Sequence, residues 1–81
     1  MEGLGQYLRL SDSARLIVFH TYKLNEKGEK VTRQKLEGIL GKKIITEGLK
    51  DIFSQREPLI EREKNKSYIV SQAAMSYFRL L

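Results

Sequence analysis

The sequence predicts an α+β fold that is mostly helical, in which three helices precede a β-hairpin and a short helix closes the chain. Apolar residues recur at helical spacing through residues 11–55, and the period changes to that of strands after Pro58. A chain of 81 residues has the length of one small domain with a compact core. We therefore expect an N-terminal arm over residues 1–10 and one domain over residues 11–81.

Composition excludes several classes of protein. The chain contains no cysteine and a single histidine, His20, so neither a disulfide framework nor a zinc site with three or four ligands is expected. Residues 1–5 lack the basic start and apolar run of a signal peptide, and the longest apolar run, residues 16–19, is far too short to span a membrane. We predict a soluble cytoplasmic protein that uses no metal and no cofactor.

The N-terminal part predicts one clear helix. Residues 1–10 hold two glycines and three leucines around Tyr7, which indicates an ordered arm or a short leading helix. The first clear helix is expected over about residues 11–23, because Ser11 or Asp12 can accept hydrogen bonds from the free amides of a first turn. Gly28 suits the turn that ends it. Its inward face, at helical spacing, is Leu10, Ala14, Ile17, Val18 and Thr21.

A second helix is expected to begin at Thr32, which is a favourable N-terminal cap. Val31 before the cap can pack on Leu36 as a hydrophobic staple. Gly41 ends the helix, and residues 42–43 are expected to form a tight connection to the next one. The inward stripe of this helix is Leu36, Ile39 and Leu40.

The third helix is expected over roughly residues 44–55. Gly48 weakens it by up to ~1 kcal/mol relative to alanine, so packing against the rest of the domain must hold it in place. Its buried face, at positions i, i+4, i+7 and i+8, is Ile45, Leu49, Ile52 and Phe53.

A change of pattern after the third helix predicts the β-hairpin. Two short segments, residues 59–63 and 67–70, flank the polar tip at residues 64–66. Asn65 tolerates the left-handed conformation that such a turn requires. Ser71 then caps a closing helix over residues 72–81.

This order of elements resembles the winged helix-turn-helix superfamily of DNA-binding proteins, over residues from about 10 to the end. Residues 31–41 resemble the first helix of its helix-turn-helix, and Ala74 stands where many members have a glycine. Small winged helices of this style occur in archaea, their plasmids and their viruses. The most specific part is a strand followed by a tyrosine-bearing strand and helix, Pro58-Leu59-Ile60-Glu61-Arg62 and Tyr68-Ile69-Val70-Ser71-Gln72-Ala73-Ala74-Met75-Ser76-Tyr77-Phe78.

The resemblance implies that the third helix enters the major groove of double-stranded DNA and that the hairpin wing contacts the backbone. The net charge of +5 favours an acidic partner, nucleic acid first and an anionic membrane second. We therefore expect a DNA-binding transcriptional regulator. The basic residues gather before the third helix, where one acid, Glu37, stands among Lys30, Arg33, Lys35, Lys42 and Lys43.

The expected DNA-binding residues lie on the second and third helices and on the wing. The lysines and arginines would hold phosphates, and Thr46, Ser54 and Gln55 would contact base edges. Glu47 can accept a hydrogen bond from cytosine. The full set is Arg33, Lys35, Lys42, Lys43, Thr46, Glu47, Lys50, Ser54, Gln55, Arg62, Lys64 and Lys66.

The charge of the third helix leaves a second interpretation open. Residues 44–56 are net neutral, with Lys50 and Arg56 against Glu47 and Asp51. A carboxylate that faces phosphates weakens binding, so this face could contact a protein instead. The alternative function is a winged helix that acts as a protein-protein interaction module and docks into a larger assembly.

A second apolar surface predicts a homodimer. Leu16 and Phe19 lie roughly opposite the inward stripe of the first helix, and such a patch often marks an interface. We expect a two-fold homodimer that presents two recognition helices to successive half-sites. The alternative is that the arm folds over Leu16 and Phe19 within one protomer. The expected interface residues are Tyr7, Leu8, Leu16, Phe19, Met75 and Leu80.

Nothing in the sequence indicates an enzyme. Ser11 and Asp12 are interpreted as caps, and they form no credible triad with Ser13 and His20. The acidic residues are scattered along charged faces and do not form a buried pair. The function expected from the sequence is therefore binding.

Overall fold

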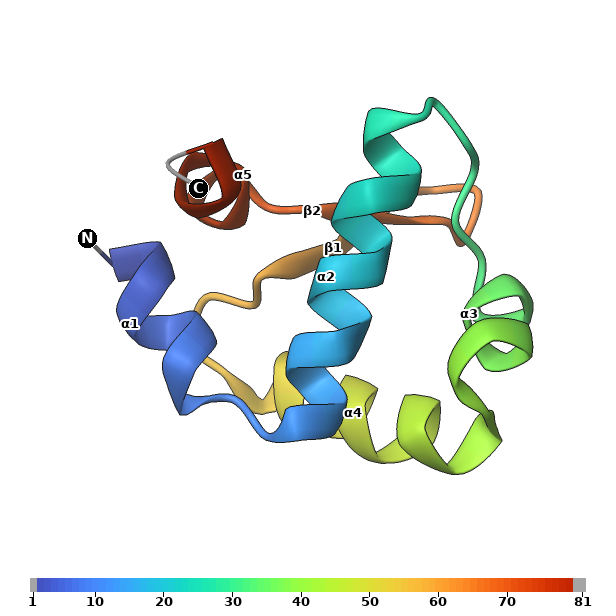
Figure 1. Cartoon of the computed structure of the whole chain (residues 1–81), viewed down its shortest axis with the longest axis horizontal. Helices are drawn as coiled ribbons and strands as arrows, with labels where there is room; N and C mark the ends of the chain where they lie inside the picture. The colour runs from blue at the N-terminus through green and yellow to red at the C-terminus, as the bar shows by residue number, and fades with distance from the viewer. Residues whose placement is uncertain (1, 80–81) are drawn as a thin grey trace.

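The computed structural model describes residues 2–79, apart from the side chains of residues 2–4, 6 and 73. Its elements confirm the predicted order of three helices, a hairpin and a closing helix, and the leading residues form an additional helix (Figure 1). The fold is thus a mostly helical α+β fold. The elements are α1 (Glu2–Arg9), α2 (Asp12–Glu26), α3 (Arg33–Leu40), α4 (Lys42–Ser54), β1 (Ile60–Arg62), β2 (Tyr68–Val70) and α5 (Gln72–Arg79).

Helix α2 is the centre of the structure. It packs against α4, α3 and β2, while α1 lies beside α5 at one end of the molecule (Figure 1). No helix in the described part of the chain has the length and apolarity needed to span a membrane. The core consists of Leu10, Ala14, Ile17, Val18, Val31, Leu36, Ile45, Leu49, Ile52, Leu59, Ile60, Tyr68, Val70, Ala74 and Phe78.

A side-chain hydrogen bond sets the start of α2, and Gly28, at φ 75°, follows its end. As predicted, Ser11 caps the start, where its hydroxyl accepts from the Ala14 N–H at 3.2 Å. The helix continues to Glu26, beyond the expected end at residue 23. Asparagine disfavours helix when its side chain competes for nearby backbone groups. Here the Asn25 side chain bonds the backbone of β2. It therefore does not compete for the backbone groups of α2, and the helix continues past residue 23.

The hairpin is attached to the helices through the outer edge of β2. Strands β1 and β2 pair antiparallel, and the Tyr68 N–H donates to the Val31 carbonyl at 2.8 Å on the other side of β2. The Asn25 side chain accepts from the Val70 N–H at 3.0 Å and donates to the Tyr68 carbonyl at 3.4 Å. These bonds satisfy backbone groups that an uncovered strand edge would expose.

The tip of the hairpin differs from the prediction in one residue. Lys66, and not Asn65, adopts the left-handed conformation, with φ 65°. The side-chain oxygen of Asn65 accepts from the Ser67 N–H at 3.1 Å and from the Ser67 hydroxyl at 2.6 Å. Asn65 therefore stabilises the turn through its side chain, and the next residue takes the positive φ.

Aromatic side chains join α1 to the rest of the fold. The Tyr7 ring centroid lies 5.0 Å from that of Tyr77 and 5.6 Å from that of Phe78. Phe78 in turn stacks on Tyr22 of α2 at 4.4 Å. Burial raises the pKa of the Tyr7 phenol above its ordinary value. The expected arm is therefore a helix that packs on α5.

One expected core residue is exposed. Ile39 of α3 has 46% of its surface accessible, whereas Leu36 is fully buried and Leu40 is half-buried. Positions 39 and 40 are about 100° apart around a helix. Because α2 and α4 contact this two-turn helix from the side of Leu36 and Leu40, Ile39 faces solvent, and its assignment to the inward stripe is wrong.

The buried hydroxyl of Thr21 predicts a stabilising substitution. Among the described residues, its Oγ1 is the one buried side-chain polar atom without a hydrogen-bond partner. We expect Thr21→Val to raise the free energy of unfolding by about 1 kcal/mol, because it removes an unsatisfied buried group. Urea denaturation measures this change.

The same substitution at Thr32 is the matched control. The Thr32 hydroxyl accepts from the Lys35 N–H at 3.1 Å, so Thr32→Val should lower the free energy of unfolding by about 1 kcal/mol. Equal losses of stability in both variants would contradict the expectation for Thr21.

Candidate nucleic-acid interface

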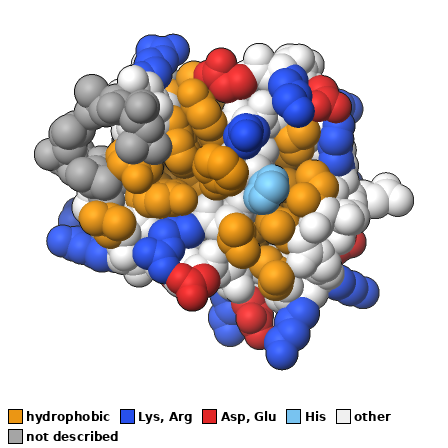
Figure 2. Space-filling model, in the orientation of Figure 1, with side chains coloured by type: hydrophobic (Ala, Val, Ile, Leu, Met, Phe, Trp, Pro, Cys, Tyr) orange, Lys and Arg blue, Asp and Glu red, His pale blue; other side chains and the backbone are white. Residues whose placement is uncertain are grey.

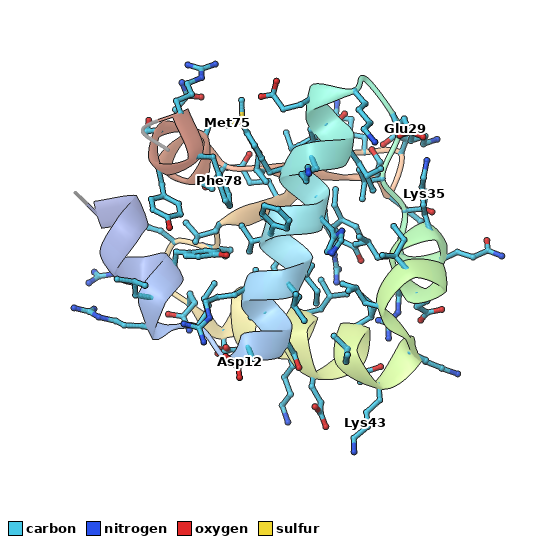
Figure 3. All side chains as sticks on the ribbon, in the orientation of Figure 1. Asp12, Glu29, Lys35, Lys43, Met75 and Phe78 are labelled. Atoms are coloured by element: carbon cyan, nitrogen blue, oxygen red, sulfur yellow. The ribbon has the colours of Figure 1, made fainter. Side chains whose placement is uncertain are left out.

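A single glycine joins α3 to α4. Gly41, at φ 93°, ends α3 and also precedes the first residue of α4. Lys42 and Lys43 are therefore the first turn of α4 and not a connection before it, because a glycine at positive φ redirects the chain within one residue. No side chain caps this helix start, and its first turn contains no acid. Both lysines are exposed, and Lys43 extends outward from the helix (Figure 3).

Arg33 holds α3 to α4. Its guanidinium donates to the Glu37 carboxylate at 3.0 Å and to the Thr46 hydroxyl at 2.9 Å. The structure thus brings together two predicted site residues, Arg33 and Thr46. Because Glu37 balances its charge and Thr46 fixes its position, Arg33 joins α3 to α4 and has less charge free for a phosphate.

Lys35 is also paired within the chain. Its ammonium donates to the Glu29 carboxylate at 2.8 Å, and the two labelled side chains lie close together in Figure 3. This hydrogen bond lowers the pKa of the Glu29 carboxyl below its ordinary value. The pair lies on the surface, where such bridges contribute little to stability, but it reduces the net charge that Lys35 offers to a partner.

The C-terminal end of α4 uses three of its polar side chains internally. The Asp51 carboxylate accepts from the Ser11 N–H at 2.8 Å, so it lies against the start of α2. The Ser54 hydroxyl donates to the Asp51 carbonyl at 2.7 Å, and the Gln55 amide donates to the same carbonyl at 3.3 Å. Ser54 and Gln55, expected to contact base edges, therefore bond the end of their own helix.

The exposed stripe of α4 is consequently more basic than its composition indicates. The exposed residues of α4 that follow its first turn are Thr46, Glu47, Lys50 and Ser54. Asp51, half-buried at the start of α2, is directed away from this stripe. Glu47 is then the one acid of α4 that remains exposed, against Lys50 and the two lysines of the first turn. Of the two carboxylates of α4, that of Glu47 is therefore the one that could face phosphates and weaken binding.

The hairpin adds one cation that aromatic rings hold in place and two exposed lysines at its tip. Arg62 lies opposite Tyr68 in the hairpin, and its guanidinium carbon is 4.7 Å from the ring centroid of Phe53 and 6.0 Å from that of Tyr68. These cation–π contacts attach the Arg62 side chain of the hairpin to Phe53 of α4. Lys64 and Lys66 are exposed at the tip.

Most of the excess positive charge lies in residues 27–71. Residues 27–71 hold eleven lysines and arginines against seven acids, whereas residues 2–26 hold three of each. Over residues 2–79, ion pairs engage Arg15, Arg33 and Lys35. The cations of the interface that have no such pair are Lys42, Lys43, Lys50, Arg62, Lys64 and Lys66.

Two residues shape this surface in ways that the sequence did not indicate. Phe53 was expected in the core, yet it is half-buried and supports Arg62. Its place at the end of the apolar stripe, shortly before a strand that carries an arginine, is a signal that could have suggested this. Asp51 accepts a hydrogen bond from Ser11, which is 40 positions away in the sequence. A local sequence pattern cannot predict such a bond.

Comparison of the chain with protein-family models, with curated proteins and with solved structures gave no match. Within residues 2–79, no group of three or more histidine, cysteine or acidic side chains is arranged to hold a metal ion. The geometry and charge of the chain itself are therefore the basis for assigning a function.

Proposed function

We propose that the chain binds double-stranded DNA, with α4 in the major groove and the wing against the backbone, and acts as a transcriptional regulator. One observation carries the proposal. Six cations without an acidic partner, Lys42, Lys43, Lys50, Arg62, Lys64 and Lys66, lie on α4 and the neighbouring wing. The winged helix resemblance of the sequence supplies the docking mode, in which these two elements contact DNA.

The hydrogen bonds that the polar side chains of α4 and Gln55 make within the protein favour an interface dominated by contacts with the DNA backbone. Ser54 and Gln55 bond the end of their helix, and Thr46 holds Arg33. Few side chains are left to distinguish base edges, whereas the lysines can contact phosphates of any sequence. We therefore propose modest sequence preference and affinity that depends on electrostatics.

A salt titration tests the proposal. If six cations neutralise phosphates, the logarithm of the association constant should fall with the logarithm of salt concentration with a slope of about −5. Fluorescence anisotropy with a labelled mixed-sequence duplex measures this slope. An absence of binding at low salt, or tighter binding to duplex RNA of the same sequence, would reject DNA as the partner. Binding that does not respond to salt would reject the lysine surface as its basis.

A further inference from the structure

The side of the molecule formed by α1 and α2 has an apolar surface that the described residues leave partly exposed. Leu8, Leu16 and Phe19, which we name the α1–α2 patch, have 58%, 40% and 38% of their surfaces exposed. A groove of about 400 Å³ lies among Tyr7, Asp12, Arg15, Leu16 and Phe19. Figure 2 shows hydrophobic side chains spread over this broad face of the molecule.

The chain covers only part of the surface that the sequence indicated as an interface. Tyr7 and Met75 are half-buried and pack against the core, and Leu80 lies outside the described residues. Helix α1 docks on α5 through Tyr7, and Leu16 and Phe19 remain 40% and 38% exposed. Of the expected interface residues, the three exposed ones that remain are those of the α1–α2 patch.

The charge around the patch favours a particular partner. Residues 2–26 are net neutral, with Arg9, Arg15 and Lys23 against Glu2, Asp12 and Glu26. A segment without net charge attracts a polyanion or an anionic membrane less strongly than the basic residues 27–71 do. Two molecules that each carry +5 repel each other through their basic surfaces, but they can approach through this one.

We propose that a second copy of this chain covers the α1–α2 patch in a two-fold dimer. A two-fold interface must be self-complementary, since each contact from one residue to another is repeated in reverse. The groove provides such a pair in Asp12 and Arg15, which form an ion pair within the protomer. Asp12 leaves 91% of its side chain exposed, so its carboxylate can also receive Arg15 of a second copy.

The α1–α2 patch lies on a broad face of the molecule (Figure 2). The molecule is viewed down its shortest axis in Figure 2, and its two longer extents are 31 and 25 Å. A specific interface typically buries ~800 Å² per partner, so the dimer contact would extend from the α1–α2 patch onto the neighbouring surface of α1 and α2. The dimer does not depend on DNA binding, although together they would give two recognition helices.

The oligomeric state in the absence of DNA tests the dimer. Sedimentation equilibrium should give twice the mass of one chain, and Leu16→Glu should return it to a single chain because a carboxylate would enter an apolar contact. Ile39→Glu is the matched control, since Ile39 is equally exposed on α3, and it should leave the dimer intact. Circular dichroism checks that both variants fold.

Charge exchange tests the contact between Asp12 and Arg15. Asp12→Arg and Arg15→Asp should each raise the dimer dissociation constant by about tenfold or more, because like charges would meet across the axis. An equimolar mixture of the two variants should form a heterodimer again. A single-chain mass of the unmodified protein at all concentrations up to the millimolar range overturns the proposal. The proposal is also overturned if Ile39→Glu dissociates the dimer and Leu16→Glu does not. DNA affinity is measured separately, so either proposal can fail alone.

Discussion

Replacing Lys42 and Lys43 together with glutamate is expected to weaken binding to duplex DNA by about a hundredfold or more at low salt, because two phosphate contacts become repulsions. The slope of the salt dependence should fall by about 2. Fluorescence anisotropy across salt concentrations measures both effects.

The free energy of unfolding of this variant should not fall together with its affinity for DNA. The two lysines occupy the first turn of α4, where cations oppose the helix dipole and acids favour it by about 0.3–1 kcal/mol each. The variant should therefore be at least as stable as the unmodified protein in thermal denaturation. Loss of binding with retained stability separates a role in DNA contact from a role in folding.

The control for this variant has the same change of charge elsewhere. Arg9→Glu with Arg79→Glu alters two exposed residues on α1 and α5, which lie side by side at the end of the molecule away from the tip of the hairpin (Figure 1). This pair should weaken binding far less than the α4 pair. Equal losses would mean that only net charge matters, and the assignment of α4 as the contact would be wrong. Unchanged affinity in the Lys42 and Lys43 variant would favour the alternative, a protein-docking role.

Substitution of Gly48 by alanine is expected to give the largest loss of stability. Gly48 of α4 is buried against α2, and a Cβ there would lie 2.9 Å from the carbonyl carbon and oxygen of Ser13 and would also clash with the Ile17 Cδ1. Overpacking of this kind costs about 1–3 kcal/mol, because backbone atoms must move apart. Alanine's better helix propensity returns at most ~1 kcal/mol. Urea and thermal denaturation should both report a net loss.

Gly38 provides the matched control in a neighbouring helix. It lies in α3, and a Cβ added there would meet no atom of another element within 4 Å, so Gly38→Ala should raise the free energy of unfolding by about 0.5–1 kcal/mol. For a domain of this size each kcal/mol shifts the melting temperature by about 4–8 °C. The two variants should thus move the melting temperature in opposite directions. A stabilised Gly48→Ala would show that α2 and α4 are not in close contact at this position.

Residues that bond close neighbours in the chain could be predicted well. The caps at Ser11 and Thr32 are hydroxyl groups that bond an amide three residues later, and such bonds depend only on local sequence. The buried faces of α2 and α4 follow from helical periodicity for the same reason. The change of period after Pro58 similarly placed the hairpin. These features decided the mostly helical α+β fold without reference to distant residues.

The candidate site depended on contacts between distant residues. The sequence identified which cations are present, but not that Lys35 pairs with Glu29 or that Arg33 spans α3 and α4. The exposure of Ile39 likewise depends on which side of a short helix its neighbours cover.

The sequence by itself determined the order of elements, most of the core and the basic character of the chain, because these follow from local hydrogen bonds and from periodic burial. Only the tertiary structure decided which charges are free. Asp51 bonds the start of α2, and Arg62 lies on the ring of Phe53. Such partners come from different elements, and their meeting depends on how the helices and the hairpin pack together.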